Sequence, residues 1–284
     1  MDDARRVILA ALAEDLGEGW EADPWGADVT SASAIPADRR SRGVLAGRQS
    51  LVVAGLPVAE EAFRLVVPEA RFRAFVADGD EVAAGTVLAE IEGPARGLLT
   101  AERTALNLLQ MLSGIATLTR RYAERLIGTG CVLLDTRKTV PGLRRLSKYA
   151  VRCGGGVNHR MGLYDAVLIK DNHIAACGGV AAAVAGARAH GGLAVRGGIE
   201  VECDDLAQVA QAVEAGADTV LLDNMDPETL RRAVALVAGR ARTEASGGVT
   251  LDTIRAIAES GVDSVSVGRI TQSAPAVDIG LDWS

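Results

Sequence analysis

Aromatic residues and lysines are scarce in this chain of 284 residues. Phe, Trp and Tyr together make up 3% of the sequence, so a hydrophobic core must be built mainly from Ala, Val, Leu and Ile. The 30 basic residues include only three lysines, Lys138, Lys148 and Lys170, and all three lie close together in the sequence. Because a compact ammonium group differs in shape from a planar guanidinium, this clustering points to a site in that region.

The sequence also lacks a long hydrophobic run and any CxxC pair. The apolar run Val7–Ala13 is too short to span a bilayer, and the acidic residues after it are not typical of a signal-peptide cleavage site. Widely spaced cysteines without metal-ligand spacing predict reduced thiols, which is typical of the cytoplasm. We therefore expect a cytoplasmic protein with no membrane partner, no disulfide and no cysteine-bound metal. The cysteines are Cys131, Cys153, Cys177 and Cys203.

The net charge of −7 argues against non-specific binding to nucleic acid, but the charge is unevenly distributed. Residues 103–173 contain twelve basic and four acidic residues, a net charge of +8, which leaves −15 for the remainder of the chain. A basic segment inside an acidic protein predicts a focused anion site rather than a broad binding surface.

The first hundred residues predict a compact α+β domain. Helical spacing covers 4–16 and 56–67, and alternating spacing predicts strands within 43–54 and at 72–76 and 87–91. A long helical stretch over 98–126 follows, with a break expected at Ser113–Gly114. We place an N-terminal sandwich domain at 1–113, onto which residues 274–284 pack back, and a second domain at 114–273.

The second domain shows regular alternation of strands and helices. Helical patterns at 206–215 and 230–237 separate neighbouring strands, and no GxGxxG follows the first strand, which disfavours a dinucleotide fold. Alternating units of this length predict a parallel sheet, here an incomplete βα barrel. The six predicted strands are 131–134, 166–170, 198–202, 218–222, 242–245 and 263–267.

Charged or glycine-containing sequence follows every one of these strands. In a barrel, chemistry gathers at the carboxyl ends of the strands, so these residues are the candidates for a site. They are Asp135–Lys138, Lys170–His173, Glu200 and Glu202, Asp223–Asn224, Glu244 with Ser246–Gly248, and Gly268–Arg269.

Several of these residues are cations suited to a substrate with many negative oxygens. One cation alone cannot bind such a substrate, and we predict that Arg137, Lys138, Arg160 and Lys170 converge, with His159 beside them. Ser246, Gly247 and Gly248 precede a helix predicted to begin near Thr250, and together with Gly268 they predict a two-loop phosphate site. These glycines belong to the predicted site because exposed amides at a helix start suit phosphate.

Two acids end neighbouring strands and face the basic residues. Glu202 and Asp223 could hold a divalent metal, bind ribose hydroxyls or stabilise a developing cation, and each could also simply neutralise a lysine. Glu200 points to the same face as Glu202, because strand side chains repeat every two residues.

Several segments, spread over most of the chain, resemble one protein family. The segments that carry the resemblance are AERTALNLLQMLSGIATLT, DTRKTVPGLRRLSKYAVRCGGGVNHRMGLYDAVLIKDNHI, LLDNM, ASGGVT and SVGRIT. They are similar to the quinolinate phosphoribosyltransferases, also called nicotinate-nucleotide pyrophosphorylases.

The resemblance implies a reaction and an assembly. It implies quinolinate and phosphoribosyl pyrophosphate as substrates, Mg²⁺ as cofactor, and nicotinate mononucleotide, CO₂ and pyrophosphate as products in de novo NAD biosynthesis. It also implies a homodimer, or a higher oligomer built from it, whose active sites are shared between two chains.

The resemblance also assigns roles to individual residues. Arg103 from the partner chain, with Arg137, His159, Arg160 and Lys170, would hold the quinolinate carboxylates. Lys138 would bridge substrate and pyrophosphate, while Glu202 and Asp223 would lie near ribose and metal, directly or through water or substrate. Lys138, Glu202 and Asp223 are thus the implied catalytic residues, and Ser246, Gly247, Gly248 and Gly268 would bind the 5′-phosphate.

Three positions depart from the family pattern, and three other functions compete with this one. Val140, Arg269 and Gln272 stand where the family commonly has Thr, a small residue and His. A paralogous phosphoribosyltransferase of the molybdenum-locus type shares part of the pattern but diverges around KDNHI, which is intact here. A Schiff-base aldolase would use Lys170 as its amine, although neighbouring cations fit anion binding better. The third alternative is a non-catalytic sensor of pyridine nucleotides.

Overall fold

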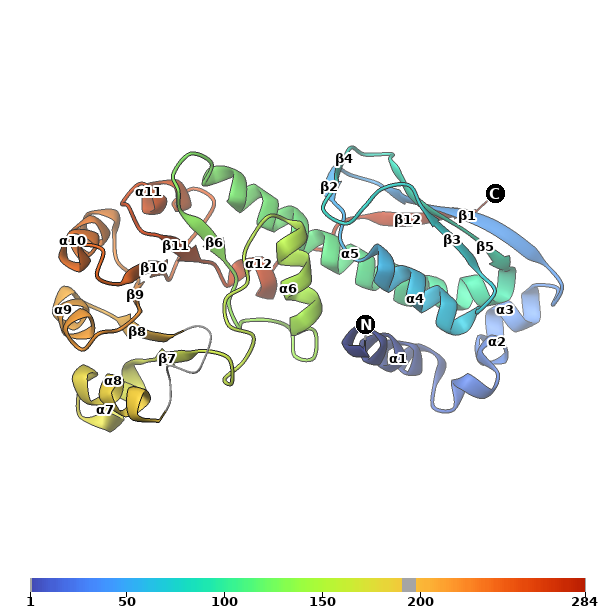
Figure 1. The fold of residues 1–284 in the computed structure, drawn as a ribbon. Helices are drawn as coiled ribbons and strands as arrows, with labels where there is room; N and C mark the ends of the chain where they lie inside the picture. The colour runs from blue at the N-terminus through green and yellow to red at the C-terminus, as the bar shows by residue number, and fades with distance from the viewer. Residues whose placement is uncertain (1, 191–197, 284) are drawn as a thin grey trace. The chain divides into compact units, whose positions relative to one another are not determined.

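The structure, a computed structural model, describes residues 2–190 and 198–283 and divides the chain into two units. The first unit comprises Met1–Thr119, Val140–Gly155 and Ser273–Ser284, and the second comprises Arg120–Thr139 and Gly156–Gln272. Each is a mixed α/β body with its own sheet (Figure 1).

The first unit is built on a four-stranded antiparallel sheet in the order β12-β1-β5-β3. The C-terminal strand β12 pairs with β1, so the end of the chain completes this sheet. Figure 1 shows α4 and α5 running along one face of the sheet, where Phe63, Leu88 and Leu109 are fully buried. The elements are α1 (Asp2–Leu16), η1 (Trp20–Ala22), α2 (Pro24–Ala27), α3 (Val29–Ala34), β1 (Arg40–Gly47), β2 (Leu51–Val52), α4 (Leu56–Val66), β3 (Arg71–Ala74), β4 (Glu81–Val82), β5 (Val87–Pro94), α5 (Ala95–Arg125), α6 (Arg144–Cys153) and β12 (Ile279–Trp283).

Helix α5 is continuous, so the predicted break at Ser113–Gly114 is wrong. The glycine serves close packing instead, because a Cβ at Gly114 would overlap the carbonyl oxygen of Pro275. The Ser113 hydroxyl bonds the backbone of Ala54, accepting from its amide at 3.0 Å. Both small residues therefore let other segments approach the helix, and the predicted domain boundary at 113/114 falls within α5.

The second unit contains a six-stranded parallel sheet in the order β6-β11-β10-β9-β8-β7. All six strands predicted from the alternation are present, and helices such as α9 and α10 lie on the outside of the sheet (Figure 1). No pairing joins β6 to β7 in the described residues, as expected for an incomplete barrel. The elements are β6 (Val132–Leu134), β7 (Val167–Ile169), α7 (Asp171–Cys177), α8 (Val180–Ala189), β8 (Ile199–Cys203), α9 (Leu206–Glu214), β9 (Thr219–Asp223), α10 (Pro227–Val237), β10 (Arg242–Ser246), α11 (Ile254–Ala258), β11 (Ser264–Ser266) and α12 (Arg269–Gln272).

Apolar side chains of these strands form the core of the unit. Val201, Val220 and Val265 are fully buried, which is typical of parallel strands covered on both faces. The parallel arrangement brings all six carboxyl ends, with the polar residues that follow them, to one edge of the sheet.

Candidate active site

A cavity of about 280 Å³ lies at this edge of the second unit. Its walls come from the ends of the six strands and from the segment that precedes β7. The lining residues are Thr136, Arg137, Lys138, His159, Arg160, Leu168, Lys170, Glu202, Leu221, Asp223, Glu244, Ser246 and Ser266. A polar cavity of this size suits a small charged molecule.

Four of the lining residues are the cations predicted from the sequence. Arg137 and Lys138 follow β6, Lys170 follows β7, and Arg160 belongs to the connection before β7. The pKa of Arg160 is lower than its ordinary value, mainly because of burial and secondly because of the charge of Arg137. The charge of Arg137 thus acts on Arg160, and an anion bound in the cavity would relieve this repulsion.

Two carboxylates end neighbouring strands in the same cavity. Glu202, on β8, forms an ion pair with Lys170, and Asp223, at the end of β9, accepts a hydrogen bond from the side-chain amide of Asn224 at 2.6 Å. Both offer oxygen ligands of the kind that Mg²⁺ prefers. The cavity thus combines an anion site with a small acidic site.

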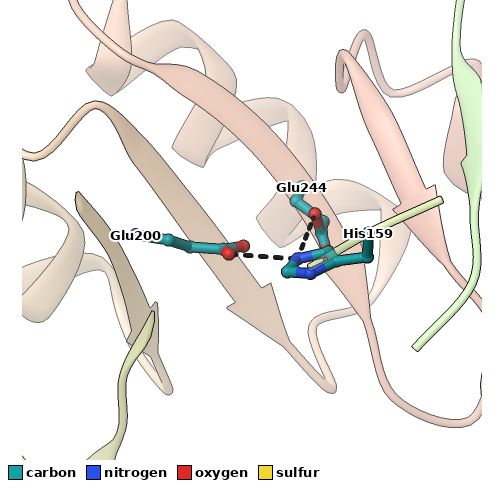
Figure 2. Close-up of side chains that lie close together, drawn as sticks. All are labelled: His159, Glu200 and Glu244. Carbon is teal, nitrogen blue, oxygen red and sulfur yellow. Dashed lines mark ion pairs between the residues drawn. The ribbon is translucent and has the colours of Figure 1, made fainter. Parts of the chain in front are cut away.

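His159 also lines the cavity, and two buried carboxylates face one nitrogen of its ring (Figure 2). Its Nε2 is 3.0 Å from Oε2 of Glu200 on β8 and 3.5 Å from Oε2 of Glu244 on β10. The two glutamates are only 6% and 2% exposed. On the other side of the ring, the backbone amide of Arg160 donates to Nδ1 at 2.7 Å. His159 therefore links two strands to the residue that carries a cavity cation.

Burial and hydrogen bonding have opposite effects on the protonation of the His159 ring. Burial lowers the pKa of His159, but the hydrogen bonds to Glu200 and Glu244 outweigh burial and raise that pKa to about 10. The Arg160 amide disfavours the doubly protonated, charged ring, because a proton on Nδ1 would face the amide hydrogen. That hydrogen bond requires a lone pair on Nδ1, so it favours the tautomer whose proton is on Nε2.

The predicted phosphate loop has the backbone that its glycines allow. Gly247 and Gly248 have φ values of 89° and 60°, and a Cβ at Gly247 would overlap the side-chain oxygen of Asn224. The helix after the loop, α11, begins at Ile254 rather than near Thr250, because a hydrogen-bonded threonine turn comes first. The loop is thus followed by a turn and then a short helix.

The structure brings most of the predicted residues together. Arg137, Lys138, His159, Arg160, Lys170, Glu202, Asp223 and Ser246 line the cavity. Gly268 is outside the lining set but adjacent to it, because a Cβ there would lie 2.9 Å from Cδ of Lys138. Gly247 and Gly248 are also outside that set, and Arg103 is an exposed residue of α5 in the first unit.

Three lining residues were given no role from the sequence: Thr136 and Glu244, which were only among the strand-end candidates, and Ser266, which was not. Glu244 had a usable signal, since an acid two residues before Ser246 on an otherwise buried strand faces the same side as that serine. Thr136 and Ser266 are small polar residues without a distinguishing pattern. The Thr136 hydroxyl accepts from the amide of Lys138 at 3.0 Å and so shapes the turn after β6.

Within the described residues, no helix is long and apolar enough to cross a membrane.

Both parts of the chain match known families. Residues 28–113 match the family described as quinolinate phosphoribosyl transferase, N-terminal domain, and residues 115–282 match the corresponding C-terminal domain.

Similar proteins match over almost the whole chain. A Bacillus subtilis protein named probable nicotinate-nucleotide pyrophosphorylase (carboxylating) is 43% identical over 98% of this chain and 92% of its own length. A Synechocystis protein of the same name is 41% identical over 95% of this chain and 89% of its own. The solved structure of the nicotinate-nucleotide pyrophosphorylase from Francisella tularensis superposes with a TM-score of 0.92 at 39% identity, covering 100% of this chain and 96% of that one.

Proposed function

Because the chain belongs to the quinolinate phosphoribosyltransferase family, we propose that it transfers the phosphoribosyl group of phosphoribosyl pyrophosphate to quinolinate. The products are nicotinate mononucleotide, CO₂ and pyrophosphate, a step of de novo NAD biosynthesis. The observation that carries this proposal is the cavity itself, in which four cations surround space for a dianionic ring and two carboxylates face the same space.

The cations fit the two carboxylates of quinolinate and the leaving pyrophosphate. Arg137, Arg160 and Lys170 would bind the ring carboxylates together with His159, and all four residues line the cavity. Lys138 is exposed at the rim of the cavity, which suits a cation that stabilises charge on the departing pyrophosphate. Ser246, Gly247, Gly248 and Gly268 would bind the 5′-phosphate through the exposed amides of the glycine-rich turns.

The chemistry needs no protein nucleophile. As the bond from C1 of ribose to pyrophosphate breaks, an oxocarbenium-like ribose forms, and Glu202 and Asp223 stabilise its positive charge. The lone pair of the pyridine nitrogen then forms the new bond to C1. The resulting cationic ring accepts the electron pair of the adjacent carboxylate bond, CO₂ leaves, and the ring carbon takes up a proton.

The acidic residues fit Mg²⁺ as a cofactor. Mg²⁺ keeps several waters and is usually bound through one or two carboxylates together with substrate phosphates, and Glu202 and Asp223 supply this donor set. Since Glu202 is ion-paired with Lys170, water or substrate would complete its contact with the metal. When bound, the ion would neutralise negative charge on the pyrophosphate.

A release assay tests the reaction. With quinolinate labelled in its 2-carboxylate, we expect ¹⁴CO₂ only when phosphoribosyl pyrophosphate and Mg²⁺ are both present. Absence of release under those conditions would contradict the proposed function and favour a non-catalytic sensor. Trapping of substrate on Lys170 by borohydride would instead indicate a Schiff-base aldolase, although that amine is engaged in an ion pair with Glu202.

We further propose a cytoplasmic homodimer in which Arg103 completes the partner's site. Arg103 is exposed on α5, a place where an arginine without such a role would simply be solvated. Arg103→Ala and Lys138→Ala homodimers should each be nearly inactive. Mixing them with subunit exchange should restore about one quarter of wild-type activity, because half of the dimers are hybrids with one intact site each. No recovery despite demonstrated exchange would place Arg103 within its own chain's site.

A further inference from the structure

The segment that carries Arg160 is held in place by buried or half-buried carboxylates. Asp135, fully buried after β6, accepts from the backbone amide of His159 at 2.8 Å. On the far side of Arg160, Asp165 accepts from the amides of Met161 and Gly162 at 2.6 and 2.8 Å. These bonds fix the backbone before and after Arg160, which leaves the amide of Arg160 itself to the ring of His159.

The bond from that amide depends on which nitrogen of His159 carries the proton. Nδ1 can accept only if the proton is on Nε2, and Nε2 faces the carboxylates of Glu200 and Glu244. Burial raises the pKa of Glu200, but a carboxylate that is ionised is only an acceptor, so an ionised carboxylate at Nε2 favours a proton on that nitrogen. The tautomer that Arg160 needs is therefore set from two other strands.

We propose that Glu200 and Glu244 are positioning residues that keep the His159 proton on Nε2, so that Nδ1 anchors the Arg160 amide and places its guanidinium at the cavity. Arg160 Nη1 also donates to the carbonyl of Ala166 at 3.3 Å, which gives the side chain a second anchor in the same segment. That this placement serves quinolinate binding rests on the proposed function; the link from the glutamates to the Arg160 amide does not.

A metal ion is the alternative occupant of this triad. His159, Glu200 and Glu244 offer ligand atoms within 4.8 Å of one another, and Oε1 of each glutamate has no hydrogen-bond partner in the described part of the chain. A histidine that binds metal through Nε2 carries its proton on Nδ1 and donates it to an acceptor. Here Nδ1 faces a donor, the Arg160 amide, so the geometry favours a proton on Nε2 over a metal.

The wild-type protein provides the first test, because the chain has only three histidines. In ¹⁵N-histidine-labelled protein, the His159 signals are assigned by their loss in His159→Asn. We expect a protonated Nε2 and an unprotonated Nδ1 at neutral pH. A protonated Nδ1 overturns the proposal, and broadening or shift of the Nε2 signal on adding Zn²⁺ or Mn²⁺ would identify a metal site instead.

Two isosteric variants provide the second test. In Glu200→Gln and Glu244→Gln the new amide can donate to Nε2, so the Nδ1–H tautomer should become populated. Quinolinate affinity, measured by equilibrium dialysis with labelled quinolinate, should fall about tenfold or more, since a small misplacement of a positioning group has large effects. The KM for phosphoribosyl pyrophosphate should change by less than about twofold.

Asp218→Asn is the matched control. Asp218 is an exposed acid that accepts from the amide of Ile199 at 2.8 Å, at the opposite end of β8 from the cavity. This variant should lower thermal stability without changing the His159 tautomer or quinolinate affinity. A loss of affinity equal to that of the glutamine variants, or unchanged affinity after a tautomer shift, overturns the proposal. If the wild type binds no quinolinate, the proposed function fails, while the NMR result still decides the link to Arg160.

Discussion

Discrimination between quinolinate and nicotinate is the sharpest test of the cationic cavity. Nicotinate lacks the 2-carboxylate, yet both acids would give nicotinate mononucleotide, so one product assay measures kcat/KM for each. Arg160 is half-buried beside Arg137, and its lowered pKa reflects burial and that neighbouring charge. A substrate with one carboxylate fewer would leave such cations without their anion.

The expected magnitude follows from the cations that face a carboxylate. A hydrogen bond to a charged group contributes about 1.5–3 kcal/mol, so two of them on one carboxylate give roughly 3–6 kcal/mol. At about 1.4 kcal/mol per tenfold, kcat/KM for quinolinate should exceed that for nicotinate by roughly 10²- to 10⁴-fold. Arg160→Ala should lower kcat/KM for quinolinate by at least about tenfold.

The control for this experiment is an arginine outside the cavity. Arg240 is exposed and donates to the backbone carbonyls of Val237 and Leu236 at the end of α10, so Arg240→Ala should leave kcat/KM within about twofold. Comparable kcat/KM values for the two acids in the wild type would refute the assignment of the cations to two ring carboxylates. Equal losses in Arg160→Ala and Arg240→Ala would refute the role of Arg160.

Three further predictions concern catalysis, packing and thiol ionisation. Lys138→Ala should lower kcat by about a hundredfold or more with a smaller change in quinolinate binding, and Lys138→Arg should not restore it fully; steady-state kinetics and a binding assay separate the two effects. Gly114→Ala should cost about 1–3 kcal/mol of unfolding free energy by overpacking α5, whereas Gly186→Ala, with nothing within 4 Å of the new Cβ, should be neutral or stabilising in denaturant titrations. Burial raises the pKa of Cys131 to about 11, so its contribution to stability is complete below the unfolded-state pKa of about 8.5 and is lost as pH rises toward 11. In a thiol assay at pH 8, the exposed Cys177 should react while Cys131 does not, and rapid reaction of both would contradict this.

The sequence predicted the second unit better than the details of the first. Six strand-like runs separated by helical spacing predict a parallel sheet, and all six strands are found. The prediction of a helix break at Ser113–Gly114 was wrong because a glycine can either end a helix or let another backbone pack closely against it. Only the fold shows that Pro275 lies against Gly114. The start of α11 was misplaced for a similar reason, since Thr250 caps a turn before the helix rather than the helix itself.

The cavity residues were predictable because a parallel sheet brings every strand end to one edge. That rule requires only the strand boundaries and the residue types after them, and it identified Arg137, Lys170 and Asp223 without any knowledge of side-chain direction. The triad of His159, Glu200 and Glu244 required more. Its hydrogen bonds depend on which strands are neighbours across the sheet and on the ring nitrogen that faces the Arg160 amide, and neither is encoded in local spacing.

The uneven charge of the sequence has a structural reason in this topology. The basic segment 103–173 supplies the cavity cations that follow β6 and precede or follow β7, whereas the acids opposite them come from β8, β9 and β10 in the acidic remainder. Cations crowded together for an anionic substrate repel one another until it binds, so carboxylates must lie within reach. Glu202 forms an ion pair with Lys170, and the charge of Glu200 partly offsets the lowering of the Arg160 pKa. The two charged parts of the sequence are therefore halves of one site, joined when the parallel strands align.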